Sequence, residues 1–306
     1  MLPRKSYTLR LPGRDALNLG DRTLVMGIIN VTPDSFADGG VHLDSERALD
    51  TALAFEAEGV DIVDIGGEST RPGAIPLSVS DEIARVLPVL QRLAPRLRVP
   101  ISIDTYKSEV AYQAIDNGAT LINDISALRY DSNLATVTAK SGVPIVLMHT
   151  RGRSREMYQE ANYTDVAGEI VQELTDAINR AVKAGISCDQ LIIDPGLGFA
   201  KQASHTFEML ARLDELAKLD RPIMVGPSRK SFLQEVLGEC PPSQREWGTA
   251  AAVAAAVLLG AHIVRVHGVR EMLQIVRIAD RLRESKSVVN QTSSSAVVPS
   301  INETHN

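Results

Sequence analysis

The chain has 306 residues, of which 44% are hydrophobic and 23% are charged, as in an ordinary soluble globular protein. Its net charge of -6 argues against a nucleic-acid partner, which normally leaves a surplus of basic residues. The longest apolar block, residues 250–259, is too short to span a bilayer, which takes roughly 20 residues. No apolar segment of a signal peptide is present in residues 1–15, and Cys188 and Cys240 lack metal-ligand spacing. We therefore predict a cytoplasmic protein with free thiols and no membrane partner.

Residues 1–22 contain two short alternating pieces, 7–11 and 16–19, on either side of Pro12-Gly13. This pattern predicts a small hairpin that covers one end of the body that follows. From residue 24 onward, apolar runs alternate with amphipathic helical patterns. Predicted strands cover residues 24–30, 60–65, 100–103, 120–122, 144–148, 190–193, 222–225 and 262–266.

Eight strands alternating with helices over roughly 260 residues are typical of a (β/α)8 barrel. A doubly wound open sheet is the competing interpretation, but its Gly-rich dinucleotide turn is missing after the first strand. We predict an α/β protein of the TIM-barrel class. The expected domains are a hairpin extension at 1–22, the barrel at 23–285 and a disordered, Ser/Thr/Asn-rich tail at 286–306.

Polar or charged residues stand at the ends of nearly all the predicted strands. They are Asn30, Asp64, Asp104, Asn123, Asp124, His149, Asp194, Lys230, Arg265 and His267. A single residue of this kind is commonly only a turn former or a helix cap, and we interpret Asp124 and Ser228 in that way. Because the carboxyl ends of barrel strands form the active-site face, the whole set predicts a site.

Lys230, Arg265 and His267 come from the last two strands, where barrels frequently bind phosphate. Alternation along a strand points Arg265 and His267 the same way. Arg71, in the loop after the second strand, can reach the same anion. The alternative is that Arg265 only neutralises Asp194 in a structural ion pair.

Asp104, Asn123 and Asp194 are expected on the other side of the mouth. Carboxylates accept hydrogen bonds and an amide both donates and accepts, which suits a flat nitrogen heterocycle with several N–H donors. Lys230 can donate to the ring, and Met148 can pack on its face or simply fill the core. Asn30 is a neutral oxygen ligand, and Mg²⁺ often needs only one or two protein oxygens beside substrate phosphates.

Eight segments form a signature in order along the chain. They are MGIINVTPDSFADGG (26–40), DIVDIGGESTRPGA (61–74), ISIDT (101–105), INDIS (122–126), IVLMH (145–149), IIDPGLGFAK (192–201), GPSRKSFL (226–233) and RVH (265–267). Together they resemble the dihydropteroate synthases, pterin-binding enzymes of folate biosynthesis. The resemblance covers about residues 24–283.

The resemblance implies that 4-aminobenzoate displaces diphosphate from hydroxymethyl-7,8-dihydropterin diphosphate. It implies Mg²⁺ at Asn30, a homodimer and sensitivity to sulfonamides. Loops containing Asp38 and Arg71 are expected to close over the site, and these two residues, with Asp104 and Lys230, are expected to be catalytic. The implied pterin and diphosphate residues are Asp64, Thr70, Asp104, Asn123, Met148, Asp194, Lys230, Arg265 and His267. Those implied to border the aminobenzoate pocket are Phe36, Arg71, Pro72, Phe199 and Ser231.

The chemistry of the residues agrees with this reaction. An aromatic amine is already neutral at pH 7, so the work lies in releasing diphosphate, which Mg²⁺ and the cationic residues would stabilise. We expect an SN1-like path in which Asp104 and Asp194 favour a pterin cation.

Two other functions are considered. One is a methyltetrahydrofolate–corrinoid methyltransferase, which shares the barrel and the pterin-binding carboxylates but needs neither Asn30 nor the RVH anion site. The other is a catalytically silent pterin-binding paralogue, suggested only by Gly268, where the family usually has Asp. We interpret that position as a helix cap, which Gly fills at a cost of a few tenths of a kcal/mol.

Overall fold

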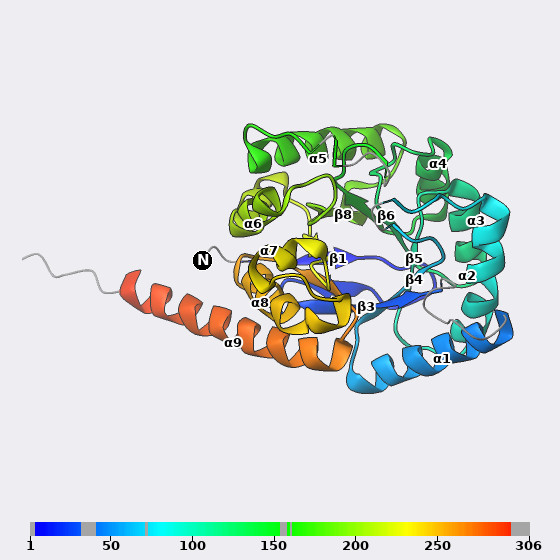
Figure 1. Ribbon diagram of the computed structural model, residues 1–306, viewed down its shortest axis with the longest axis horizontal. Helices are drawn as coiled ribbons and strands as arrows, with labels where there is room; N and C mark the ends of the chain where they lie inside the picture. Colours follow the sequence, from blue (N-terminus) through cyan, green and yellow to red (C-terminus); the bar gives the residue numbers. More distant parts are fainter. Residues whose placement is uncertain (1–3, 32–40, 71–72, 154–157, 160, 295–306) are drawn as a thin grey trace, which may run out of the picture.

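The computed structural model describes residues 4–31, 41–70, 73–153, 158–159 and 161–294. Eight parallel strands lie side by side in the order β8-β7-β6-β5-β4-β3-β10-β9 and form a nearly closed barrel surrounded by helices (Figure 1). A bridge between Ile193 and Ile223 joins the two edge strands, and Ile193 N donates to Pro222 O at 3.0 Å. The predicted TIM barrel is confirmed.

The bounds of the elements follow the predicted alternation. The barrel strands are β3 (Leu24–Asn30), β4 (Ile62–Gly66), β5 (Ile101–Asp104), β6 (Leu121–Asp124), β7 (Ile145–Met148), β8 (Leu191–Asp194), β9 (Met224–Val225) and β10 (Ile263–Val266). The helices are α1 (Val41–Glu58), α2 (Val79–Leu93), α3 (Ser108–Asp116), α4 (Asn133–Ser141), α5 (Val166–Lys183), α6 (Ala203–Ala211), α7 (Gln234–Leu237), α8 (Glu246–Leu258) and α9 (Val269–Ser294). The last helix continues past residue 285, where we placed the end of the barrel.

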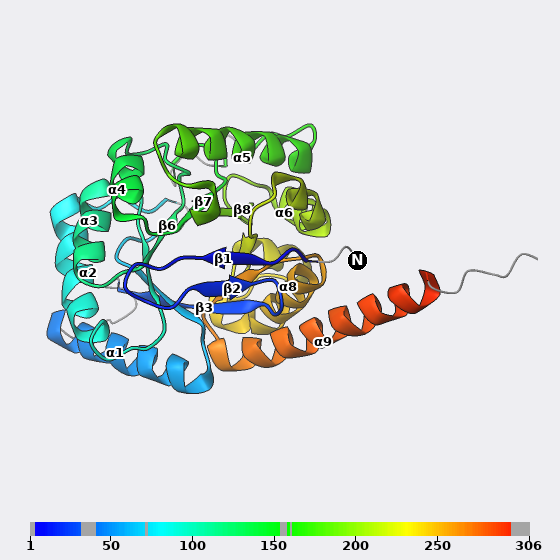
Figure 2. The ribbon, with the colours of Figure 1, turned by 180° about the vertical axis from the view of Figure 1, so that it is seen from behind.

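The hairpin packs against the amino-terminal end of the barrel. Its strands β1 (Tyr7–Leu9) and β2 (Leu17–Leu19) pair antiparallel, with Thr8 opposite Asn18. Leu9 and Leu19 are buried in one cluster with the inward side chains near the strand starts, among them Met26 and Ile62. Figure 2 shows the hairpin across that end of the strands. The predicted plug is therefore present.

Side chains alternate between the barrel interior and the layer beneath the helices. In β4, Ile62 points inward in the cluster with the hairpin, whereas Val63 and Ile65 belong to the core shared with the helices. Asp64 is two residues beyond Ile62, so the same periodicity turns its carboxylate into the mouth of the barrel. The interior is thus apolar near the hairpin and polar at the opposite end.

No helix in the described part of the chain is long and apolar enough to cross a membrane.

Candidate active site

An arginine bridges two carboxylates in the mouth of the barrel. Arg265, on β10, donates through Nε to Asp64 Oδ2 at 2.6 Å and through Nη2 to Asp104 Oδ2 at 2.6 Å. The side chain of Asp64 is fully buried, and that of Arg265 is 17% exposed. Since β4 and β5 are neighbours and β10 lies beyond β3, the guanidinium reaches across the mouth to hold both acids.

This bridge corrects one of our expectations. The alternative ion pair of Arg265 with Asp194 is wrong, because the hydrogen-bond partners of the guanidinium are Asp64 and Asp104. The long side chain of Arg265 thus links the residues expected to bind an anion to those expected to bind a heterocycle.

The remaining strand-end acceptors and donors line the same mouth. Asn123 Nδ2 donates to Asp64 Oδ2 at 3.2 Å, and Asp194 Oδ1 accepts from Gly196 N at 2.7 Å. Among the described residues, Asp64 Oδ1 has no hydrogen-bond partner although it is buried. A buried carboxylate oxygen without a donor is unfavourable, so a ligand with N–H groups would satisfy it.

Lys230 and two apolar side chains form another wall of the mouth. Lys230 Nζ lies 3.7 Å from the centre of the Phe199 ring, a cation–π contact. Phe199 and Met148 are buried in one small cluster with Tyr106 and Ile125. A flat ring placed here would meet an apolar surface on one face and polar groups at its edges.

Burial shifts the charges of these groups toward neutrality. Desolvation raises the pKa of Asp104 to about 7, with Arg265 opposing and Asp64 reinforcing the rise. Desolvation likewise raises the pKa of Asp194 to about 6 and lowers that of Lys230 to about 7. Acid and base with pKa values near 7 in one pocket are characteristic of a functional site.

A second cluster joins β3 to the loops after β9 and β10. Ser228 Oγ lies 2.9 Å from His267 Nδ1 and accepts from His267 N at 3.1 Å. Asn30 Nδ2 lies 3.5 Å from His267 Nε2. Our interpretation of Ser228 as a mere turn former is therefore wrong, because it holds the histidine backbone and ring.

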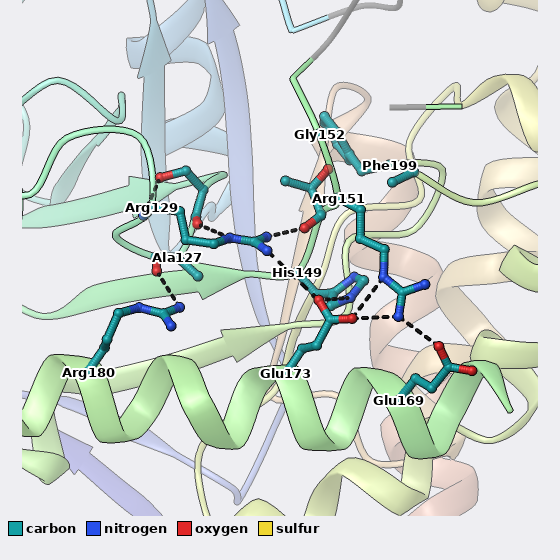
Figure 3. Close-up of polar contacts among 12 residues, drawn as sticks. Ala127, Arg129, His149, Arg151, Gly152, Glu169, Glu173, Arg180 and Phe199 are labelled. Carbon is teal, nitrogen blue, oxygen red and sulfur yellow. Dashed lines mark hydrogen bonds and ion pairs between the residues drawn. The ribbon is translucent and has the colours of Figure 1, made fainter. Parts of the chain in front are cut away.

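Some expected residues are placed differently or are not described. His149 is buried, and its ring contacts Lys201 rather than the carboxylates of the mouth. Figure 3 shows its other contact, with Glu173. Asp124 accepts from the nearby amides of Ser126 and Leu128, which confirms its local role. Thr70 is half-buried in the loop after β4, and Ser231 is exposed. Phe36, Asp38, Arg71 and Pro72 lie outside the described residues.

The expected Mg²⁺ site rests on one protein ligand, the side-chain amide of Asn30. Within the described ranges, no group of three or more His, Cys, Asp or Glu side chains is arranged to hold a metal ion. Because Asn30 Nδ2 faces His267, Oδ1 is the atom of this side chain that can bind a cation. A neutral oxygen next to an anion site fits a Mg²⁺ whose other ligands are phosphate oxygens and water.

Sequence reasoning missed one residue of this region. Lys201 is only 1% exposed, and its Nζ contacts His149 Nδ1 and two backbone carbonyls. A lysine is normally exposed, so the apolar and glycine residues at 195–200 were the one signal in the sequence that this lysine is buried.

Comparisons with known proteins agree with this site. The model of the pterin binding enzyme family matches residues 26–267. The dihydropteroate synthase of Synechocystis sp. is 44% identical over 270 residues, which cover 88% of this chain and 93% of the relative.

Two solved structures are similar to this fold. The dihydropteroate synthase of Xanthomonas albilineans with 4-aminobenzoic acid has a TM-score of 0.85 and 41% identity, covering 91% of this chain and 99% of that one. The Yersinia pestis enzyme in complex with a sulfonamide drug has a TM-score of 0.84 and 41% identity, covering 90% and 99%. The chain therefore belongs to the pterin-binding enzymes, as a member of the dihydropteroate synthase family.

Proposed function

We propose that the barrel mouth condenses hydroxymethyl-7,8-dihydropterin diphosphate with 4-aminobenzoate, giving 7,8-dihydropteroate and diphosphate. The observation that carries this proposal is the bridge from Arg265 to Asp64 and Asp104. A permanent cation beside two carboxylates supports the binding of a pterin ring with an anionic tail. The related enzyme of Xanthomonas albilineans, solved with 4-aminobenzoic acid, supports the second substrate.

The pterin ring would be held by the acceptors and donors at the strand ends. Asp64, Asp104 and Asp194 offer carboxylate oxygens to the N–H groups of the ring, and Asn123 offers an amide. Lys230 would donate to a ring nitrogen or the carbonyl. Met148 supports one ring face, as its burial beside Phe199 suggests.

The diphosphate would lie toward β3 and β10. Arg265, His267 and Thr70 are its proposed contacts, and Ser228 fixes the orientation of His267. Mg²⁺ bound to Asn30 Oδ1 would neutralise charge on the phosphate oxygens and so make diphosphate a better leaving group. Two loop residues, Asp38 and Arg71, would close over the bound substrates and take part in catalysis. The aminobenzoate pocket would be bordered by Phe36, Arg71, Pro72, Phe199 and Ser231.

The step itself is proposed to be SN1-like. The bond between the exocyclic carbon and oxygen breaks, and its electron pair leaves with diphosphate. The cation that remains is spread over the pterin and is stabilised by the carboxylates of Asp104 and Asp194. The neutral amine of 4-aminobenzoate then forms the C–N bond and loses a proton, so no strong base is needed.

The test is product formation by the purified chain. Dihydropteroate and diphosphate are expected in equal amounts, and Arg265→Met should abolish both. The matched control is Arg14→Met, which removes contacts with Leu97, Arg98 and Val99 carbonyls at the other end of the barrel. Bound pterin without product from the wild-type chain would identify a silent paralogue instead.

The same site is proposed to bind sulfonamides, which resemble 4-aminobenzoate, as the related Yersinia pestis enzyme does. Competitive inhibition against 4-aminobenzoate, and not against the pterin, is the expected result.

We also propose a cytoplasmic homodimer. Cys188 and Cys240 are both free, as expected in a reducing compartment. Val236 and Trp247, on α7 and α8, are 73% and 84% exposed, and burial in a second copy would remove these apolar side chains from water. Sedimentation of the wild type and of Trp247→Glu tests the assembly: a dimer that persists in both would place the interface elsewhere.

A further inference from the structure

A buried ammonium group lies behind the mouth of the barrel. Lys201 Nζ lies 2.9 Å from His149 Nδ1 and donates to Gly196 O at 3.1 Å and to Phe199 O at 3.0 Å. An ammonium has three N–H donors, so each has one acceptor here. Burial lowers the pKa of Lys201 to about 7, which the carboxylates of Asp194 and Glu173 oppose.

Two of these acceptors belong to the loop that follows β8, residues 195–201. Gly196 N donates to Asp194 Oδ1 at 2.7 Å, and Phe199 N donates to Gly196 O at 3.0 Å. Ala200 has φ of +48°, a region that non-glycine residues seldom adopt. A Cβ on Gly196 would lie 1.9 Å from His149 O, so the loop lies directly on the exit of β7. This conformation needs contacts to maintain it.

The loop presents one side chain and one backbone amide to the mouth. The ring of Phe199 contacts Lys230 Nζ at 3.7 Å, and the amide of Gly196 holds Asp194. Asp64, Asp104 and Asn123 lie instead on the strands and do not depend on this loop. A displaced loop would therefore affect the Phe199 side of the site more than the carboxylates.

Glu173, on α5, contacts both His149, the partner of the lysine, and Arg151 (Figure 3). His149 Nε2 lies 3.2 Å from Glu173 Oε2, and Arg151 Nε donates to Glu173 Oε1 at 2.8 Å. Arg151 also lies over the ring of Tyr163, whose hydroxyl donates to Ala200 O at 2.9 Å. With a neutral His149 whose Nδ1 accepts from Lys201, the Nε2 proton faces Glu173. Nε2 has no partner in hydrogen-bond geometry among the described residues, so Glu173 braces the ring through this close contact.

We propose that Lys201, braced by His149 and Glu173, is a positioning residue that holds the 195–201 loop so that Phe199 and Lys230 form one wall of the aminobenzoate pocket. This inference rests on the proposed function. Lys201 touches neither substrate in this account and acts only through the loop.

The first test replaces the ammonium with an uncharged side chain of similar length. Lys201→Met should raise KM for 4-aminobenzoate on the order of tenfold or more, as expected for a misplaced pocket wall. The dissociation constant of the pterin substrate should change much less, because most of its contacts are on strands. Arg4→Met is the matched control, since it removes a buried cation that contacts Asp280 and Ala261 O at the opposite end of the barrel. It should lower stability without changing KM.

A pair of histidine variants keeps the test decisive if Lys201→Met fails to fold. His149→Asn retains an acceptor for Lys201, whereas His149→Leu removes it. His149→Leu should reproduce the rise in KM, and His149→Asn should remain closer to the wild type. Equal KM values for Lys201→Met or His149→Leu and the wild type would overturn the proposal.

Hydrogen exchange separates this inference from the proposed function. Amides of residues 195–201 should exchange on the order of tenfold faster in Lys201→Met or His149→Leu than in Arg4→Met, whatever the reaction is. Faster exchange with a wild-type chain that makes no dihydropteroate would refute the function but retain the loop contact. Unchanged exchange with an active wild type would refute the positioning role alone.

Discussion

The carboxylate of Glu246 occupies the space that a side chain on Gly268 would need: a Cβ on Gly268 would lie 2.2 Å from Glu246 Oε1. Gly268 O accepts from Met272 N at 3.1 Å, the first helical bond of α9, which agrees with our interpretation of this position as a cap. Glu246 Oε2 also accepts from Arg229 Nε at 2.8 Å. The glycine therefore leaves room for an acid that comes from α8.

Gly268→Asp should destabilise the chain as long as Glu246 is present. Two carboxylates would compete for one space, and over-packing alone costs about 1–3 kcal/mol. In a Glu246→Ala background, the same Asp is free to cap α9, which is better than Gly by only about a few tenths of a kcal/mol. Urea unfolding of the wild type, the two single variants and the double variant gives the coupling free energy between positions 246 and 268. Additive effects of the two substitutions would show that the acids do not share this space.

Asp104→Asn should lower kcat more than it weakens pterin binding. The ring keeps an oxygen acceptor, but the charge that stabilises a developing cation is lost, and such losses reach about a hundredfold or more in rate. Steady-state kinetics and calorimetric titration of the pterin substrate measure the two effects separately. Asp61→Asn is the control, because Asp61 pairs with Arg22 away from the mouth. Equal losses in rate and affinity would argue against the cationic transition state.

Asn30→Ala should raise the Mg²⁺ concentration for half-maximal rate about tenfold or more, since it removes the proposed protein ligand. Calorimetry provides a readout without turnover: Mg²⁺ should tighten binding of the pterin diphosphate to the wild type and much less to the variant. Binding of the pterin without diphosphate should be the same in both. An identical response to Mg²⁺ would place the metal elsewhere.

The buried, neutral His149 should make the free energy of unfolding decrease as the pH falls below 6.5. Burial and the charge of Lys201 lower its pKa from 6.5 to about 3, so the unfolded chain binds a proton in acid that the folded chain does not. The stabilisation is complete above pH 6.5 and is lost as the pH falls toward 3, by about 1.4 kcal/mol for each pH unit. The free energy of unfolding of His149→Asn, measured with urea, should therefore fall less steeply from pH 6.5 to pH 4.5 than that of the wild type.

His262 provides the comparison for that experiment. Burial lowers its pKa to about 4, and Ile223 N donates to its Nδ1 at 3.1 Å near the hairpin. His262→Gln should flatten the same part of the pH profile without affecting the 195–201 loop. A His149→Asn profile parallel to that of the wild type would mean that His149 is protonated in the folded chain.

The barrel was predictable because the strands are apolar and alternate strictly with helices. The polar mouth was predictable too, since Asp64, Asp104 and Asp194 lie at or near the carboxyl ends of β4, β5 and β8, and parallel strands end on one face. The alternation of side chains along β7 also indicates that His149 does not belong to the mouth. Met148 points into the barrel, so His149, the next residue, should point out, as it does.

Contacts between distant segments could not be predicted. The partners of Arg265 depend on how far a long side chain reaches across the mouth, and periodicity gives only its direction. The histidine contact of Ser228 and the burial of Lys201 arise in irregular loops, where no period links residues to a face. These are the residues that orient the site rather than those that define its chemistry.

The most direct test of the account is whether the barrel mouth releases diphosphate before the amine attacks. The pterin diphosphate, carrying ¹⁸O in the bridge between the methylene carbon and phosphorus, is incubated with the chain and Mg²⁺ in the absence of 4-aminobenzoate. Reversible ionisation predicts that the label moves into non-bridging positions, and that Asp104→Asn slows this movement. A label that stays in the bridge, while complete reaction mixtures form dihydropteroate at the full rate, would contradict the cationic path and require direct displacement by the amine.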